Sequence, residues 1–212
     1  MNPGAADKAA ERGTWIHGAV ENHIRGFEVR PPSAYEGYWK KVPEKMDEIL
    51  EDGSVLWSEK PYNKPIWNRY VGDDGVGRLH FYCQQEDVGY AGCPDLIYTN
   101  SNKENVLTDV KTSVGPYSSK FPKAKDVMDE SLRKALVSGV FKLKKTRLQL
   151  AAYKIAAEAC LGIKIHKTQI FVATPLEEYP VQVFTFSERE ADKDTEDWMK
   201  ILRQFYKEPA IA

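Results

Sequence analysis

The spacing of hydrophobic residues predicts that the chain begins with two helices. Between residues 7 and 25 the apolar side chains recur at the three- and four-residue spacing of one helix face: Trp15, Ile16, Ala19, Val20 and Ile24. Pro31 and Pro32 end that helix. The same spacing predicts a second helix over 35–50, with Gly53 as a stop just beyond it.

The rest of the chain alternates strand and helix patterns. Two-residue alternation, with a polar turn in each hairpin, predicts strands at 54–60, 78–83, 89–98, 105–113, 167–175 and 181–186. Helices are predicted at 125–136 and at 146–162, where Gly162 closes an Ala- and Leu-rich run. Ser187 and Glu190 form a capping box that opens a last helix, ending near residue 206.

This order of elements indicates one α/β domain over residues 1–212, with a mixed central sheet flanked by helices. We expect four parts along it. They are the N-terminal helices (1–53), a strand meander (54–113), a basic segment (114–147), and a crossover helix, hairpin and closing helix (148–212).

Composition places the chain among ordinary globular proteins. Of its 212 residues, 42% are hydrophobic and 29% are charged. No apolar run approaches the ~20 residues that a membrane helix requires, so no membrane partner is expected. The first residues contain no apolar signal segment, which favours an intracellular, cytoplasmic protein.

Charge and cysteine content narrow the chemistry. Lys and Arg number 30 and Asp and Glu 31, so any site for a polyanion must come from local clustering of charge. Cys83, Cys93 and Cys160 form no CxxC pair, and three thiols cannot alone supply a four-ligand zinc or iron–sulfur centre. The cysteines are therefore expected to be packing residues.

Two carboxylates and a lysine are expected to meet on one surface of the sheet. Asp109 and Lys111 alternate along the strand 105–113 and so share a face, and the hairpin brings Asp95 beside Asp109. Neighbouring carboxylates repel each other unless a cation lies between them, and oxygen ligands suit Mg²⁺ or Mn²⁺. The alternative is an ordinary surface hairpin that carries Asp and Lys.

Two helices add further polar groups. His17 lies within the first amphipathic helix, and Gln149 and Tyr153 share a face of the Ala-rich helix because they are four residues apart. Taken alone, a His such as His17 is more often a hydrogen-bonded core residue than a ligand, and Gln149 and Tyr153 mark a half-buried helix.

Together, the order RGTWIH, GCPDLIY, TDVKTS and QLAAY resembles the RecB-type branch of the PD-(D/E)XK nuclease superfamily, from about Arg12 to Thr174. The branch includes phage exonucleases and the mitochondrial genome maintenance exonuclease. The resemblance implies a restriction-endonuclease-like core and a metal-dependent DNA exonuclease of recombination or repair, in a bacterial or phage-infected cell. The alternatives are a structure-selective or site-specific endonuclease and a non-catalytic DNA-binding accessory protein, and an RNA substrate stays open.

The resemblance also implies roles for residues. His17, Asp95, Asp109 and the carbonyl of Val110 would bind Mg²⁺ or Mn²⁺, with Asp109 in place of the commoner Glu, and Lys111 would be the catalytic lysine. Gln149 and Tyr153 would face the DNA. Glu59 is either an additional acid of the site or an exposed residue at a strand end. Some members hold an iron–sulfur cluster with four cysteines, one of them before the His motif. No cysteine precedes His17, so no cluster is expected.

A basic segment follows the catalytic strand. Residues 114–147 contain nine basic and three acidic side chains, a local charge of +6 on a chain whose net charge is −1. We expect DNA contacts in this segment from Lys120, Lys123, Lys142, Lys144, Lys145 and Arg147. Tyr117, Phe121 and Phe141 are positioned to stack on bases, or else the segment is a solvated loop with its aromatics in the core. DNA, as a single strand or as duplex ends, is the expected partner, and a recombination or single-strand-binding protein is a conceivable second one.

Overall fold

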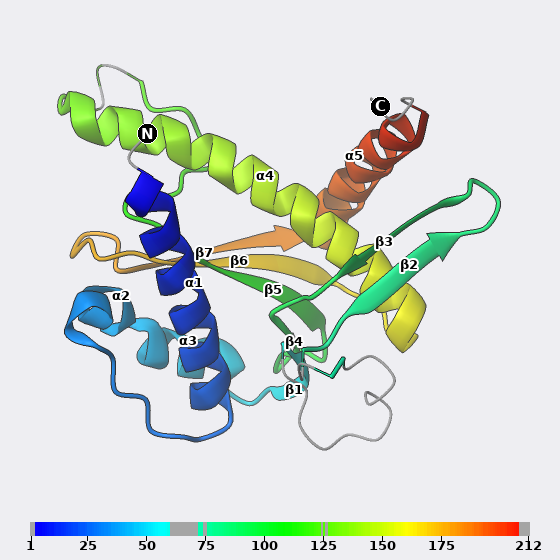
Figure 1. Ribbon diagram of the computed structural model, residues 1–212, viewed down its shortest axis with the longest axis horizontal. Helices are drawn as coiled ribbons and strands as arrows, with labels where there is room; N and C mark the ends of the chain where they lie inside the picture. The colour runs from blue at the N-terminus through cyan, green and yellow to red at the C-terminus, as the bar shows by residue number, and fades with distance from the viewer. Residues whose placement is uncertain (1–2, 60–71, 74–75, 124, 126, 208–212) are drawn as a thin grey trace.

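A five-stranded mixed sheet forms the centre of the protein, in the order β1-β4-β5-β6-β7 (Figure 1). The structure is a computed structural model that describes residues 3–59, 72–73, 76–123, 125 and 127–207. Its helices are α1 (Pro3–Ile24), the short 3₁₀ helix η1 (Ser33–Tyr35), α2 (Glu36–Trp39), α3 (Val42–Leu50), α4 (Glu130–Leu161) and α5 (Glu188–Lys207). Its strands are β1 (Ser54–Ser58), β2 (Leu79–Cys83), β3 (Val88–Gly92), β4 (Leu96–Thr99), β5 (Asn105–Thr112), β6 (Lys167–Ala173) and β7 (Val181–Ser187).

The sheet is mixed because β5 and β6 run parallel while the other neighbours are antiparallel. A parallel pair needs a long crossover, and α4 supplies it between β5 and β6. The predicted class, a mixed sheet flanked by helices, is therefore confirmed. Strands β2 and β3 form a separate hairpin that packs against α4.

Helices cover both faces of β5, and the two faces carry different chemistry. Leu107 belongs to the core that includes Leu143 and Leu150 of α4. Val110 belongs to the core on the other face, which includes Ile16 of α1. Because side chains alternate along a strand, Asp109 and Lys111 lie on the Leu107 side, toward α4. The α1 helix approaches from the Val110 side.

The predicted strand 89–98 is wrong, because it is two strands in different sheets. β3 ends at Gly92 and β4 begins at Leu96. Pro94 lies between them and has no N–H for a strand ladder, and its carbonyl instead accepts a hydrogen bond from Trp57 Nε1 at 3.1 Å. This break is what frees Asp95 from the strand. Lys60, assigned to the first predicted strand, lies outside the described residues.

The helix boundaries also differ from the prediction. The single helix expected over 35–50 is divided into η1, α2 and α3, with Pro43 near the start of α3, where its missing N–H costs nothing. The helices expected at 125–136 and 146–162 are one helix, α4, which begins at Glu130. Asp129 caps its N-terminus, because its side chain accepts a hydrogen bond from the Leu132 N–H at 2.7 Å. Gly162 ends it in a left-handed conformation (φ 65°), as predicted.

The capping box at the start of α5 is confirmed. The Ser187 N–H and hydroxyl both donate to Glu190 Oε2, at 3.0 and 2.7 Å. In the described part of the chain, no helix combines the length and apolar character that crossing a bilayer demands.

Candidate metal centre

The candidate site forms where β5 extends beyond its neighbour β4. The β4 pairing stops at Thr108, whereas β5 continues to Thr112 beside β6. On the uncovered edge, Asp95 Oδ2 accepts a hydrogen bond from the Val110 N–H at 2.7 Å. The N–H and C=O of one strand residue point to the same edge, so the Val110 carbonyl also faces Asp95.

His17 and Glu59 join Asp95 at this edge. His17 Nδ1 lies 3.1 Å from Asp95 Oδ1 and 3.7 Å from Glu59 Oε2. Glu59 follows β1, and its N–H donates to the Asp95 carbonyl at 3.0 Å, which fixes the two acidic residues side by side. One ligand atom from each of the three residues lies within 4.8 Å of the others. The structure therefore groups Glu59 with the metal-ligating types rather than leaving it as an isolated strand-end acid.

The two carboxylates control the protonation of His17. Burial lowers the pKa of His17, but the adjacent Asp95 carboxylate, with help from Glu59, outweighs burial and raises that pKa to about 10. Without a metal ion, the two carboxylates therefore favour the protonated, positively charged form of His17. A divalent cation between the same carboxylates would supply that positive charge instead and take the place of the proton on Nδ1.

Asp109 and Lys111 form a second, buried part of the site. Asp109 is 1% exposed, and its Oδ2 lies 2.6 Å from Lys111 Nζ. Burial, with the negative charge of Asp95, raises the pKa of Asp109 to about 7. Burial lowers the pKa of Lys111, but the charges of Asp109 and Asp95 more than reverse this and leave it raised. Asp95 and Asp109 are thus electrostatic neighbours, as predicted, although Asp109 is not part of the 4.8 Å group.

The residues present fit a hard divalent cation. Apart from the Lys111 ion pair, Asp109 Oδ2 has no hydrogen-bond donor among the described residues, although it is buried. The site as a whole offers one imidazole nitrogen, the carboxylates of Glu59, Asp95 and Asp109, and the Val110 carbonyl. Such an oxygen-rich set suits Mg²⁺ or Mn²⁺ better than a soft metal. We expect a bound ion to have both Asp95 and Asp109 as ligands.

Gln149 and Tyr153 lie on the Lys111 side, as their positions on α4 require. Gln149 Nε2 donates to the Tyr153 hydroxyl at 2.6 Å. Burial raises the pKa of Tyr153 to about 12, and the charges of Asp109, Asp95 and Lys111 also act on it, so the phenol stays protonated. The ring packs against Gly92, where an added Cβ would lie 2.5 Å from Tyr153 Cε1.

The basic segment divides into exposed and engaged side chains. The side chains of Lys120, Lys123, Lys144 and Lys145 are exposed. Arg147 instead makes two hydrogen bonds with Asp194, at 2.8 and 2.9 Å, and lies over the Phe186 ring. Its charge is used within the protein, and no local pattern signals this because Asp194 is 47 residues away. Asp126, one of the three acids counted in the segment, lies outside the described residues.

The aromatic residues of this segment divide in the same way. Tyr117 is only 6% exposed, so the expectation that it stacks on bases is wrong, and it packs in the core beside Leu143. Phe121 and Phe141 are 52% and 60% exposed and meet edge to face, with ring centroids 5.6 Å apart. Lys144 Nζ lies 5.6 Å from the centre of the Phe121 ring. An exposed aromatic pair with a cation beside it is suited to stacking on unpaired bases.

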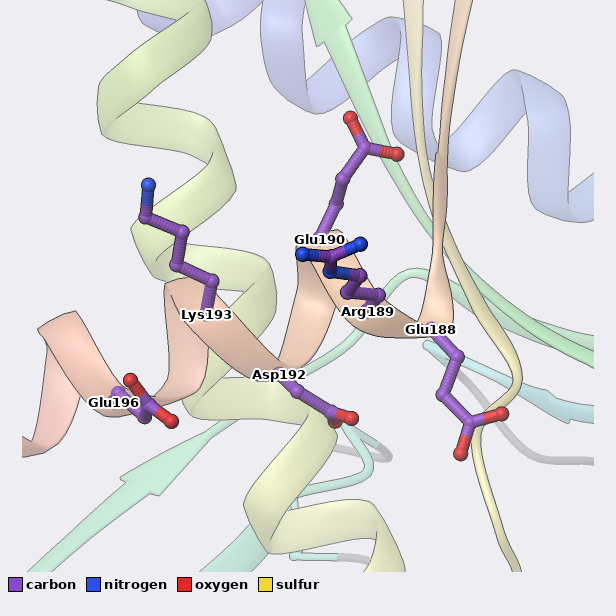
Figure 2. A pocket seen from close by; sticks show the side chains of 6 residues that line it. All are labelled: Glu188, Arg189, Glu190, Asp192, Lys193 and Glu196. Atoms are coloured by element: carbon purple, nitrogen blue, oxygen red, sulfur yellow. The ribbon is translucent and has the colours of Figure 1, made fainter.

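Another hollow in the surface lies away from this site. It has a volume of about 860 Å³ and is lined only by residues of α5 (Figure 2): Glu188, Arg189, Glu190, Asp192, Lys193 and Glu196. Its four acids disfavour a phosphate chain. A hollow of about 410 Å³ opens instead beside His17 and Glu59, along the α1 residues Ala10, Gly13, Thr14, Gly18 and Glu21. His17 and Glu59 are therefore open to solvent through this hollow.

Comparison with known proteins adds only distant likenesses. No protein-family model matches the chain, and no curated protein matches it significantly. The fold is similar to the crystal structure of a candidate exonuclease from Eubacterium rectale, at 12% identity and a TM-score of 0.38, over 89% of this chain and 74% of that one. It is also similar to the crystal structure of SSO0001, at 13% identity and a TM-score of 0.33, over 92% and 89% of the two chains.

Proposed function

We propose that the protein is a metal-dependent deoxyribonuclease of the PD-(D/E)XK superfamily that acts as an exonuclease on DNA ends, in recombination or repair. One observation carries the proposal. A buried Asp109–Lys111 ion pair lies in the electrostatic field of Asp95, which is itself held against His17 and Glu59. An acid pair with a lysine and an open ligand group is the arrangement that phosphodiester hydrolysis needs.

The residues divide the chemistry between them. His17, Glu59, Asp95, Asp109 and the Val110 carbonyl would hold Mg²⁺ or Mn²⁺. The ion lowers the pKa of a bound water and neutralises charge on the scissile phosphate. Lys111 Nζ, two residues along the strand from Asp109, orients the attacking water and stabilises the charge that develops on the phosphate. Because Asp109 is buried, bulk water screens its interaction with Lys111 only weakly.

The surface around the site supports DNA as the substrate. The exposed Lys120, Lys123, Lys144 and Lys145 offer cations to a phosphate backbone. Phe121 and Phe141 offer ring faces to bases that have left the stack, which favours a strand end over an intact duplex interior.

A cleavage assay on four forms of DNA tests the proposal. End-labelled single- and double-stranded DNA, each linear and circular, is incubated with Mg²⁺ or Mn²⁺, and Lys111→Ala serves as the control. We expect loss of linear DNA only, and none in the variant. Cutting of circles would replace exonuclease with endonuclease. No cleavage with any ion would overturn the enzyme proposal and leave a DNA-binding accessory protein.

A further inference from the structure

Two cations from opposite faces of the sheet are anchored immediately beyond Lys111. Arg12 of α1 donates from Nε to Thr112 Oγ1 at 3.2 Å. Lys142 of α4 donates from Nζ to Ser113 Oγ at 3.0 Å. Thr112 and Ser113 are the next two residues after Lys111, so both cations converge on the end of β5 that borders the candidate site.

Within the described residues, the contacts of these two cations are with hydroxyl and aromatic groups rather than with carboxylates. Among the described residues, Arg12 and Lys142 make no ion pair, whereas Lys134, on the same helix as Lys142, pairs with Glu130 at 2.7 Å. Their other contacts are aromatic: the Arg12 guanidinium lies 4.8 Å from the centre of the Tyr38 ring, and Lys142 Nζ lies 5.9 Å from that of Tyr117.

The two charges also oppose each other. Burial and then the charge of Arg12 lower the pKa of Lys142, so the pair is close enough to interact unfavourably. Like charges held together without a counterion are costly unless an anion binds between them. Only Nε of Arg12 is used by Thr112, and its two terminal nitrogens make no hydrogen bond within the described part of the chain, so they remain available for the paired contacts that Arg makes with phosphate.

We propose that Arg12 and Lys142 form a phosphate clamp that holds the backbone of the nucleic-acid strand next to the bond that is cut. The clamp rests on the proposed nuclease function and adds a second anion site to it. Ser113 lies two residues beyond Lys111, about 7 Å along the strand at ~3.3 Å per residue. A phosphate held there positions the neighbouring one at Lys111 and the metal ligands.

Binding of a labelled strand tests the clamp without cleavage. The probe is a fluorescein-labelled thymidine oligonucleotide, and its affinity for Lys111→Ala protein is measured by anisotropy in Mg²⁺ at several salt concentrations. Adding Arg12→Gln or Lys142→Gln should weaken binding about tenfold and reduce the salt slope by about one. Arg12→Lys and Lys142→Arg should restore most of both. The matched control is Lys134→Gln, a paired lysine on the same helix, which should change affinity less than about twofold.

The outcomes separate the clamp from the nuclease function. If the parent binds the strand and wild type cleaves DNA, but both Gln variants keep full affinity and slope, the clamp is refuted and the nuclease proposal stands. If the parent does not bind and wild type does not cleave, both fail together. Thermal melting checks that each variant folds. If Arg12→Gln does not fold, the test rests on Lys142→Gln, because the Lys142 side chain is exposed. An unchanged affinity in that variant overturns the clamp.

Discussion

Asp109 and Lys111 share one face of β5 and an ion pair, yet we assign them different roles. Asp109 is buried and lacks any other hydrogen-bond donor among the described residues, which suits a metal ligand. Lys111 is partly exposed, so its ammonium can reach a bound phosphate and water. The two roles predict different effects on metal binding when each side chain is removed.

Lys111→Ala should lower the cleavage rate by about 10²-fold or more, because it removes charge stabilisation from the transition state. Its affinity for Mn²⁺ should stay within a few-fold of wild type. Asp109→Asn should lose both. Single-turnover cleavage and calorimetric titration measure the two quantities. Full activity of Lys111→Ala in Mg²⁺ would show that the roles are wrongly assigned.

Glu59 is the acid whose role the sequence leaves open. Its position 3.7 Å from His17 predicts that Glu59→Gln weakens Mn²⁺ binding by about tenfold, since a ligand or ligand-orienting carboxylate is removed. The matched control is Glu44→Gln, which changes an exposed acid that pairs with Lys41. Calorimetry measures the affinity of both variants for Mn²⁺. Equal affinities would show that Glu59 has no part in metal binding and is an ordinary residue at a strand end.

At the scale of elements, the sequence predicted correctly those features that depend on neighbouring residues in the chain. The alternation in 105–113 and the helix stop at Gly162 depend on neighbouring residues, and both are confirmed. The split between β3 and β4 was missed because alternation does not reveal which sheet a strand joins. The joining of the two predicted helices into α4 was missed because the residues between them, 137–145, include Gly139 and three lysines and give no clear helical pattern.

The close approach between α4 and the loop after β5 depends on Gly139. A Cβ at this position would lie 2.3 Å from the Pro116 carbonyl oxygen and 2.9 Å from Tyr117 Cα, so backbone would have to move. We expect Gly139→Ala to lower the free energy of unfolding by about 2 kcal/mol. Chemical denaturation measures the change.

Gly18→Ala is the matched control, because Gly18 is also within a helix but nothing lies within 4 Å of its added Cβ. It should be neutral or stabilise by up to about 1 kcal/mol through helix propensity. Equal effects of the two substitutions would contradict the close packing of α4 on that loop.

At the scale of the whole molecule, β5 packs against α1 on one face and against α4 on the other. From one face, α1 contributes His17 and Arg12, and from the other, α4 contributes Tyr153 and Lys142. The order of motifs in the sequence predicted roles for His17 and Tyr153, and the basic segment predicted one for Lys142. Neither pattern predicted the Arg12 contact with Thr112 or the Arg147–Asp194 pair, because both join residues that are distant in the chain and lack a local signature.

A divalent ion should stabilise the whole fold, since its proposed ligands come from α1, the residue after β1, the residue before β4, and β5. An ion at 100 times its Kd adds about 2.7 kcal/mol to the free energy of unfolding. Wild type should therefore melt at a higher temperature in Mn²⁺ than in EDTA. Asp95→Asn should show no such difference, and an equal Mn²⁺ effect in that variant would place the ion elsewhere.

We propose that these acids make the protein a metal-dependent nuclease. The rate of cleavage of end-labelled linear DNA as a function of Mg²⁺ concentration, for wild type and Asp109→Asn, tests this proposal. We expect a wild-type rate that rises with Mg²⁺, saturates and vanishes in EDTA, with no detectable cleavage by the variant. Equal rates for the two proteins, or no cleavage by wild type at any Mg²⁺ or Mn²⁺ concentration, would contradict it.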